Sequence, residues 1–301
     1  MRDPISIVLP TYNRATTLRR VLDSYLEQEA VGEIVVVDDG STDDTGGFIR
    51  SRQNDARSIV YLGSDAHRGL PASRNVGVKQ ARGNYILFGE DDLALRPGYA
   101  KQLLACLSSS GASIAAGRIV YQLPAETVEQ ALTRVSAPAA DRIDRRRISF
   151  EASAPADEDL EVPFIHAISL VRREVFDDVM FDECYRGNAY REETDFYLRA
   201  RNAGHRIYFC PNALCVHLPR EVKTLGGSMA QGIWRYKYWS IRNNYVFLKR
   251  HHASLKREGL VVGRLPALML WFTWSELTKV PSFYLRRYVP ALYSLLAKRA
   301  R

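Results

Sequence analysis

Acidic side chains gather at three points of this sequence, and each group suggests a different piece of chemistry. Asp38 and Asp39 precede a glycine, residues 90–92 are Glu-Asp-Asp, and residues 192–195 are Glu-Glu-Thr-Asp. A carboxylate at the end of a strand can accept a hydrogen bond from the imide N–H of uracil or thymine, or from ribose hydroxyls. Three adjacent acids can bind Mg²⁺ or Mn²⁺, which would bridge them to a diphosphate. A glutamate near a reacting hydroxyl group can act as its base.

Each acidic group also has an ordinary structural interpretation. Residues 41–43 (Ser-Thr-Asp) would cap a following helix, and the acids at 90–92 would form a solvated loop. Acids in the first turn of a helix are favoured by its dipole, and Asp195 can pair with Arg199 four residues later. For residues 90–92 we favour the metal, because adjacent acids at the end of a buried strand repel one another and raise each other's pKa unless a cation joins them.

Two basic side chains are further candidates for the site. His217 follows a predicted strand, where an imidazole can bind the same cation or a phosphate, although a lone histidine is more often a surface or core residue. Arg74 and Asn75 lie in the segment Gly-Leu-Pro-Ala-Ser-Arg-Asn-Val-Gly. There Arg74 can contact a phosphate or a base, or simply lie on a helix surface.

These residues need a scaffold that brings strand ends together, and the first 120 residues predict one. Apolar runs of strand length alternate with amphipathic segments. In order we expect a strand at 5–10, a helix at 16–28, a strand at 33–38, a helix capped at 42–44 and ending near 54, a strand at 59–62, a helix at 71–81 and a strand at 85–89. The predicted fold class is α/β, with a mostly parallel central sheet and helices on both faces. Ligands should gather at the carboxyl ends of the strands.

The remaining chain is less regular. A helix near 97–109 and a strand near 113–120 precede residues 122–161, which are rich in Ala, Pro, Asp and Arg. We interpret this part either as a mobile excursion that acts as a lid or as a simple surface insertion. Order returns at 163–171, followed by helices at 173–179 and 191–203 and strands at 206–209 and 213–217. From about residue 228 the sequence is basic and aromatic.

Taken together, the order of these motifs resembles the family 2 glycosyltransferases of the GT-A fold. The resemblance covers about residues 4–250, and seven weak motifs in the family's order make it specific. They are Pro-Thr-Tyr-Asn-Arg at 10–14, Asp-Asp-Gly-Ser-Thr-Asp at 38–43, the segment at 69–77, Gly-Asn-Tyr-Ile at 83–86 running into 90–92, Arg-Arg-Glu-Val-Phe at 172–176 with Phe-Asp-Glu at 181–183, the acids at 192–195 with Arg199 and Gly204, and His217. The resemblance implies a Rossmann-like nucleotide-diphospho-sugar transferase fold.

The resemblance also implies roles for individual residues. The donor nucleotide would be held by Pro10, Thr11, Tyr12, Asn13, Asp39, Arg74 and Asp91. A divalent cation, Mn²⁺ or Mg²⁺, would be held by Asp92, with His217 as a further ligand. Glu193 would be the catalytic base and Glu192 the glutamate before it, and the reverse assignment stays open. The sequence departs from the family twice: Glu90 is the first acid of the metal motif, and the base is a glutamate where aspartate is common.

The function that this resemblance implies is inverting transfer of a sugar. The donor would be a UDP-, dTDP- or GDP-linked sugar, and the acceptor a hydroxyl of a saccharide or a lipid-linked molecule in cell-surface polysaccharide or glycolipid synthesis. Two other classes remain open. One is a catalytically inactive scaffold that binds sugar nucleotides, and the other is a nucleic-acid-binding module built on residues 234–252. The second would leave the acidic motifs unexplained, so we predict no nucleic-acid partner.

Charge divides the chain into two parts. Residues 1–200 carry 24 Lys and Arg against 31 Asp and Glu, whereas residues 201–301 carry 18 against 3. The longest apolar run, at 265–274, has about half of the ~20 residues needed to span a bilayer. Residues 265–296 mix aromatic and basic side chains, which suits an anionic membrane surface, but a helical pair packed on the catalytic domain or a homodimer interface fits as well. With no signal peptide visible, we expect a cytoplasmic protein, peripheral on the inner face of the membrane.

The sequence also predicts where the domains divide and in which redox state the cysteines are. Residues 1–250 would form the GT-A catalytic domain, with a nucleotide-sugar-binding half at 1–120, a mobile insertion at 121–162 and an acceptor and catalytic-base half at 163–250. Residues 251–301 would form a helical C-terminal appendage. Four cysteines are too few for a disulfide framework, and Cys210 and Cys215 lack a partner pair for zinc, so we expect reduced thiols in the core and a cytosolic setting.

Overall fold

The chain folds into two compact units. The computed structural model describes residues 5–53, 58–219 and 232–288. Unit 1 comprises residues 1–143, 150–185 and 192–227, and unit 2 comprises residues 144–149, 186–191 and 228–301. The boundary expected at residue 250 lies inside the single helix α8 (Ile233–Arg257), so the units divide the chain at other places.

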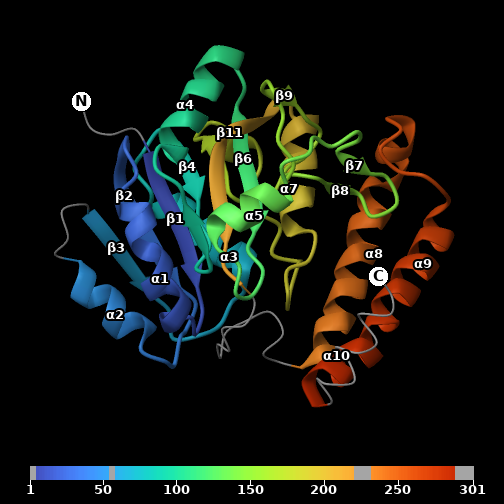
Figure 1. The fold of residues 1–301 in the computed structure, drawn as a ribbon, viewed down its shortest axis with the longest axis horizontal. Coiled ribbons are helices and arrows are strands. Elements are labelled where there is room, and N and C mark those ends of the chain that lie inside the picture. Colours follow the sequence, from blue (N-terminus) through green and yellow to red (C-terminus); the bar gives the residue numbers. More distant parts are fainter. Residues whose placement is uncertain (1–4, 54–57, 220–231, 289–301) are drawn as a thin grey trace. The chain divides into compact units, whose positions relative to one another are not determined.

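Unit 1 is built on a nine-stranded sheet with the order β3-β2-β1-β4-β10-β6-β11-β5, and β9 also pairs with β11 (Figure 1). Strands β1 to β4 are parallel, as are β6 and β11, whereas β10 runs antiparallel between β4 and β6. The strands are β1 Ile5–Thr11, β2 Val31–Asp38, β3 Ser58–Gly63, β4 Tyr85–Phe88, β5 Leu93–Leu95, β6 Ile114–Tyr121, β9 Leu160–Glu161, β10 Ser169–Arg172 and β11 Ile207–His217. The prediction of a mostly parallel central sheet is confirmed.

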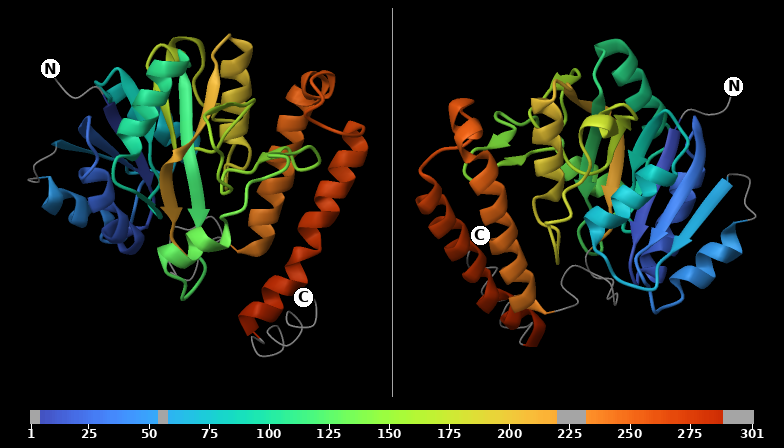
Figure 2. Two further views of the ribbon diagram at one scale, coloured as in Figure 1. Left: turned by 45° about the horizontal axis from the view of Figure 1, so that its top comes forward. Right: turned by 180° about the vertical axis from the view of Figure 1, so that it is seen from behind.

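Helices cover both faces of this sheet, as predicted. Right-handed crossovers place α1 and α2 on one face and α3, which leads back to β4, on the other, as the opposed views show (Figures 1 and 2). The helices of unit 1 are α1 Ala15–Leu26, α2 Thr45–Arg52, α3 Leu70–Gln80, α4 Tyr99–Ser110, α5 Val128–Arg134, α6 Val175–Asp178 and α7 Glu192–Asn202.

The sequence pattern explains why the sheet is central. Every residue of β1 is buried, as expected for an apolar strand covered on both faces. Helix α1 buries its apolar positions at helical spacing, including Leu18, Val21 and Leu22. On the other face, a Cβ added at Gly77 of α3 would lie 2.3 Å from Cγ1 of Val8, so the missing side chain lets α3 pack closely on β1.

Two segments differ in detail from expectation. The strands predicted at 206–209 and 213–217 form the single strand β11, which carries a register irregularity between Cys210 and Leu214. Residues 122–161 contain α5, whose N-terminus has a Thr127–Gln130 capping box, and three short strands, β7 (Ile143–Asp144), β8 (Ser149–Phe150) and β9. This part is therefore more regular than its sequence suggested, because a local cap and pairing with β11 order it.

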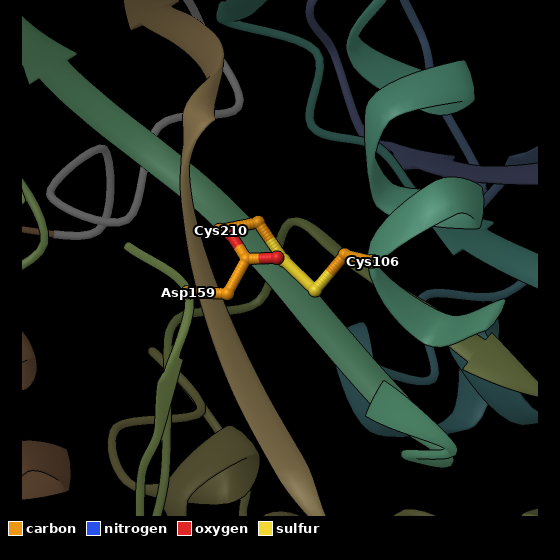
Figure 3. A group of neighbouring side chains, drawn as sticks. All are labelled: Cys106, Asp159 and Cys210. Atoms are coloured by element: carbon orange, nitrogen blue, oxygen red, sulfur yellow. A yellow bond between two sulfur atoms is a disulfide. The ribbon is translucent and has the colours of Figure 1, made fainter. Parts of the chain in front are cut away.

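The expectation of reduced thiols is wrong for two of the four cysteines. Cys106 of α4 and Cys210 of β11 form a disulfide, with Cα atoms 6.6 Å apart (Figure 3). Cys184 and Cys215 are not disulfide-bonded. The sequence could not predict this pair, because 104 residues separate the two cysteines and only the packing of α4 on β11 brings them together. The argument for a cytosolic setting from reduced cysteines therefore no longer holds.

Unit 2 contains the helices α8, α9 (Leu265–Leu277) and α10 (Lys279–Tyr288), and α9 packs against α8. The buried Arg191 joins α8 to the loop between β7 and β8. It donates to Asn244 Oδ1 at 2.9 Å and to the carbonyl of Ile148 at 2.7 Å. Within the described residues, the helices are too short or too polar to cross a bilayer.

Candidate functional site

The predicted site residues lie mainly where strands of unit 1 end. Thr11 ends β1, Asp38 ends β2 and His217 ends β11, while the acids at 90–92 follow β4. Because β1, β2 and β4 are parallel neighbours, their carboxyl ends meet at one edge of the sheet. Glu192 begins α7, which adds a helix N-terminus to the set.

Asp39 is fixed as a hydrogen-bond acceptor. Its carboxylate receives the backbone N–H groups of Arg68 and Gly69, each at 2.8 Å, and lies 2.8 Å from Nδ1 of His67. Burial opposes its ionisation, but these hydrogen bonds outweigh that effect and lower the pKa of Asp39. Asp39 also lines a pocket with Leu62, Gly63 and other residues between β2, β3 and α3. An anionic acceptor in a pocket fits the predicted contact with a base or ribose.

The segment after β1 holds this edge in place. Asn13, with φ of 52°, accepts through Oδ1 from the backbone N–H groups of Thr42 and Asp43, so it joins the β1 end to the β2 end. Tyr12 is half-buried and stacks on His67 with ring centroids 4.2 Å apart. Pro10 is buried inside β1. Of the predicted base-binding segment, Tyr12 is therefore the side chain placed to contact a ligand.

The acids at 90–92 are held by their own loop. The buried Tyr25 hydroxyl donates to the carbonyl of Glu90 at 2.9 Å and accepts from its N–H at 3.0 Å. Asp91 accepts from the Thr11 hydroxyl at 2.8 Å. Burial, above all, raises the pKa of Asp91 to about 7, and Asp92 adds to the shift. Burial and the charge of Asp92 likewise raise the pKa of Glu90, whose side chain is a third exposed.

Three of these side chains could hold a divalent cation. The ligand atoms of Glu90, Asp92 and His217 lie within 4.8 Å of one another. Nδ1 of His217 lies 2.8 Å from the carbonyl oxygen of Leu218, which makes it the donor and leaves Nε2 directed at Asp92, 3.5 Å away. Two carboxylates and an imidazole suit Mn²⁺ or Mg²⁺, so the residues present fit the predicted metal.

A second group of possible ligands does not fit a metal. Cys106, Asp159 and Cys210 also come close together in the described part of unit 1. The two sulfur atoms are bonded to each other beside the Asp159 carboxylate (Figure 3). A disulfide offers no thiolate to a cation, so we assign no metal to this group.

Arg74 takes a different place from the one predicted. Its side chain is 1% exposed and forms an ion pair with Glu192, and it lies 3.7 Å from Glu90. Its guanidinium also faces the rings of Phe88 and Phe181. Arg74 therefore holds Glu192 and lies beside Glu90, and other parts of the protein cover its side chain. The resemblance implied instead that Arg74 contacts the nucleotide.

The structure separates the two neighbouring glutamates. Glu192 is 3% exposed and its Oε1 is bound to Arg74. Burial raises the pKa of Glu192, although the charge of Arg74 opposes the shift. Glu193 is only half-buried, so solvent or a substrate can reach it. This difference in exposure is a reason to prefer Glu193 to Glu192 as the base, and the assignment stays a prediction. Asp195 pairs with Arg199 at 2.7 Å, as the ordinary interpretation of this helix expected.

Three residues that have no role predicted from the sequence also lie at the site. Arg14 lies 3.0 Å from Asp92 and 3.5 Å from Asp91. His67 contacts Asp39 and Tyr12, and Tyr25 fixes Glu90. Arg14 stood inside a motif and could have been singled out as a cation near acids. His67 and Tyr25 lie on a loop and on an apolar helix face, where the sequence carries no distinguishing signal.

Comparisons with known proteins agree with this geometry. The model of the family described as glycosyl transferase family 2 matches residues 6–180, more than half of the chain. Glycosyltransferase GlyA of Streptococcus pneumoniae is 35% identical over 116 residues, which are 38% of this chain and 16% of the relative. Succinoglycan biosynthesis protein ExoO of Rhizobium meliloti is 34% identical over 112 residues, 37% of this chain and 32% of the relative. The chain thus spans a third or less of the length of these two relatives.

A further relative and a solved structure extend the comparison. GalNAc(5)-diNAcBac-PP-undecaprenol beta-1,3-glucosyltransferase of Campylobacter jejuni is 33% identical over 102 residues, 33% of each chain. The crystal structure of S. aureus TarS 1-349 in complex with UDP-GlcNAc has a TM-score of 0.55 at 18% identity, covering 85% of this chain and 75% of that one. At this identity the structural likeness concerns the fold alone, and it agrees with the predicted GT-A architecture.

Proposed function

The chain belongs to glycosyl transferase family 2, and from that premise we propose that it transfers a sugar, with inversion, from a nucleoside diphosphate donor to an acceptor hydroxyl. The observation that carries the proposal is the convergence of Glu90, Asp92 and His217 at the end of the sheet. The nucleotide-sugar donor is supported by the family and by TarS, whose structure contains UDP-GlcNAc. UDP-, dTDP- and GDP-sugars are the donors to test.

In the proposed mechanism, Glu193 accepts the proton of the acceptor hydroxyl while the acceptor oxygen attacks the anomeric carbon. The bond between that carbon and the diphosphate oxygen breaks, and the nucleoside diphosphate leaves with the electron pair. Mn²⁺ or Mg²⁺ bound by Glu90, Asp92 and His217 would supply the positive charge that stabilises the leaving diphosphate. Asp39 and Tyr12 hold the nucleoside, and Arg74 keeps Glu192 and Glu90 in place.

A transfer assay with matched variants tests this proposal. Asp92→Ala and Glu193→Gln should each abolish sugar-nucleotide turnover, and Asp92→Ala should also lose metal-dependent nucleotide binding. Glu174→Gln is the control for Glu193, since Glu174 is an exposed glutamate at the start of α6. Undiminished turnover in both site variants would contradict the assignment. Nucleotide binding without turnover in the wild-type chain would favour an inactive scaffold.

The acceptor is proposed to be a saccharide or a lipid-linked molecule, used in cell-surface polysaccharide or glycolipid synthesis. The names of two relatives support this class, since one acts in succinoglycan biosynthesis and the other on an undecaprenol-linked acceptor. Such an acceptor would place the enzyme at the cytoplasmic face of a membrane. Dimerisation also stays a prediction.

Unit 2 presents a surface that suits this location. On α9, Leu270, Trp274 and Leu277 are 75%, 68% and 40% exposed, and their i, i+4, i+7 spacing puts them on one face. Tyr284 and Tyr288 form a similar exposed pair on α10. Exposed apolar side chains in a row mark an interaction surface. We call these five residues of α9 and α10 the exposed apolar set.

The positive charge of the segment that carries the exposed apolar set favours an anionic membrane as its partner. Residues 228–301 contain 14 Lys and Arg but only 2 acids, and one of these, Glu276, is buried against Lys237. Two copies of so basic a segment would repel each other, which argues against a dimer here. The aliphatic side chains of Leu270 and Leu277 suit lipid better than stacking on nucleic-acid bases.

Vesicle flotation tests the membrane proposal. The full chain should float with phosphatidylglycerol vesicles at moderate salt, and Leu270→Glu with Trp274→Glu should lower binding by roughly tenfold or more, because two large apolar side chains no longer enter the lipid. Leu123→Glu in unit 1 is the control, since Leu123 is 49% exposed. Equal flotation of all three chains would show that Leu270 and Trp274 do not carry the binding, and a full chain that does not float would contradict the membrane proposal. Binding to an oligonucleotide instead would favour the nucleic-acid alternative.

A further inference from the structure

His67 makes two contacts that a nucleobase would be expected to make at this site. Its ring stacks on Tyr12, with centroids 4.2 Å apart and planes inclined by 27°. Its Nδ1 lies 2.8 Å from Oδ2 of Asp39, the carboxylate that is proposed to accept an imide N–H. A flat ring that stacks on an aromatic side chain while donating to a carboxylate has the two recognition features of uracil or thymine.

His67 also covers the carboxylate. The side chain of Asp39 is 6% exposed, whereas that of His67 is 39% exposed and lies on the loop between β3 and α3. A base therefore cannot approach Asp39 along the face that the imidazole covers. The exposure of His67 shows that solvent surrounds part of the ring, so a rotation of its side chain would not require the core to open.

Asp39 does not depend on His67 for its position. The backbone N–H groups of Arg68 and Gly69 hold both of its oxygens. The same loop passes close to Gly40, where an added Cβ would lie 3.1 Å from the carbonyl carbon of Ala66 and 3.2 Å from the nitrogen of His67. This close approach and the φ of 84° at Gly40 fix the loop backbone, so the imidazole can leave while the acceptor stays in place.

We propose that the His67 imidazole occupies the nucleobase position of the donor site and is displaced by the incoming pyrimidine. This inference rests on the proposed function. In the unliganded chain the ring keeps Tyr12 and Asp39 paired, and binding exchanges one stacked donor for another. Because only the open fraction of the chain can bind, the imidazole lowers the apparent affinity for the nucleotide by that fraction. His67 would thus be a residue that sets donor affinity without taking part in the transfer step.

Another histidine of unit 1 provides a matched control. His205 pairs with Asp178 at 2.9 Å between Nε2 and Oδ2, nearly the distance found for His67 and Asp39. Its other ring nitrogen lies 3.2 Å from the Ser113 hydroxyl, at the start of β6 and away from the base pocket. Replacing His205 removes a histidine–aspartate pair without uncovering a pocket.

Calorimetric titration of the full chain with UDP, dTDP and GDP in the presence of Mn²⁺ tests the proposal. His67→Ala should bind UDP or dTDP roughly five- to tenfold more tightly than the wild-type chain, because the competing ring is gone. His205→Ala should bind like the wild type. Weaker binding by His67→Ala would overturn the proposal and make His67 part of the binding surface or a support for the loop.

A measurement on the unaltered chain separates the remaining outcomes. In NMR spectra, the His67 ring protons should move when UDP saturates the site, since the ring leaves Tyr12, whereas those of His205 should not. UDP binding with unchanged His67 signals would overturn the displacement and leave the proposed function standing. If neither the wild-type chain nor His67→Ala binds any of the three nucleotides, the proposed function fails and this inference fails with it.

Discussion

Each compact unit buries an ion pair, and the two pairs have opposite electrostatic surroundings. In unit 1, Arg74 of α3 pairs with Glu192 of α7, and the side chains are 1% and 4% exposed. In unit 2, Lys237 of α8 pairs with Glu276 of α9 at 2.6 Å, and the side chains are 7% and 9% exposed. Both pairs join separate helices in the interior of their unit.

The number of charges around each pair differs. Glu276 has a second cation, Lys279, and although burial opposes its ionisation, the two lysines lower its pKa. Around Glu192 the charges are mostly acidic. Burial raises the pKa of Glu192, Arg74 opposes this, and Glu193, Glu90 and Asp195 add to the rise. Among the described residues, Nε of Arg74 and Oε2 of Glu192 also have no hydrogen-bond partner.

The different surroundings indicate different roles for the two ion pairs. A carboxylate with two lysines is satisfied, so the pair in unit 2 stabilises the contact between helices. The pair in unit 1 lies in a region that is short of positive charge. A shortage of that kind is costly for stability and is expected where a cation is to be bound.

The largest effect should follow from breaking the pair in unit 1. Above pH 8, where Glu192 is ionised, Arg74→Met should lower the free energy of unfolding by about 3 kcal/mol, because Glu192 and Glu90 lose the cation they share. Turnover should fall roughly tenfold or more, since these carboxyls support the metal and the base. Urea unfolding and a transfer assay measure the two quantities.

The double variant Arg74→Met, Glu192→Leu is the control for this prediction. Removing both charges should recover most of the stability, since no uncompensated carboxylate remains at Glu192. Turnover should stay low. If Arg74→Met unfolds at the wild-type urea concentration, the pair in unit 1 contributes little to stability and the comparison fails.

A smaller loss should follow from breaking the pair in unit 2. Lys237→Met should cost about 1.5–3 kcal/mol, the range for a hydrogen bond to a charged group, because Lys279 still compensates Glu276. Donor affinity and turnover of a soluble acceptor should not change. A loss of nucleotide binding in Lys237→Met, measured by calorimetry, would contradict the division of roles between the two pairs.

Much of unit 1 could be predicted from the sequence, because its elements follow local patterns. The apolar runs of β1 and β2 and the amphipathic face of α1 fix the parallel sheet, and a strand end must present whatever residue follows it. For this reason the sequence alone predicts that Asp39, Asp92 and His217 lie where strands end. Their spacing along the chain carries the information.

Other features depend on packing between distant segments and were not predictable. Arg74 was expected on a helix surface or against a ligand, but the face of α3 that carries it is covered by residues more than 100 positions away, such as Phe181 and Glu192. The same holds for the disulfide between Cys106 and Cys210. Charge counts showed that residues 201–301 are basic, but not that Lys237 is buried.

Two buried tyrosines allow a finer test of why the acids of unit 1 are crowded. Tyr25 binds the backbone of Glu90, and Tyr99 binds the N–H of Gly117 and the carbonyl of Ile168 in the same manner. Tyr25→Phe and Tyr99→Phe should each cost about 1–2 kcal/mol, because each removes both hydrogen bonds of a buried hydroxyl group. Only Tyr25→Phe should weaken the affinity for Mn²⁺. Equal Mn²⁺ affinities in the two variants would mean that the loop needs no anchor.

The smallest effect, when it is followed one pH unit at a time, is the pH dependence of stability, which should have opposite signs for the two carboxyl groups. Burial raises the pKa of Glu192 to about 8. Between pH 4.5 and 8 the folded chain then keeps a proton that the unfolded chain has released, so this contribution falls as pH rises, by at most about 1.4 kcal/mol per pH unit. The pKa of Glu276 is lowered, so its contribution is present above pH 4.5 and is lost as pH falls. In urea unfolding, Glu192→Gln should gain stability relative to the wild type as pH rises from 4.5 to 8, and the cost of Glu276→Gln should shrink as pH falls below 4.5. Slopes of the same sign would show that the two pairs do not differ in the way their surroundings indicate.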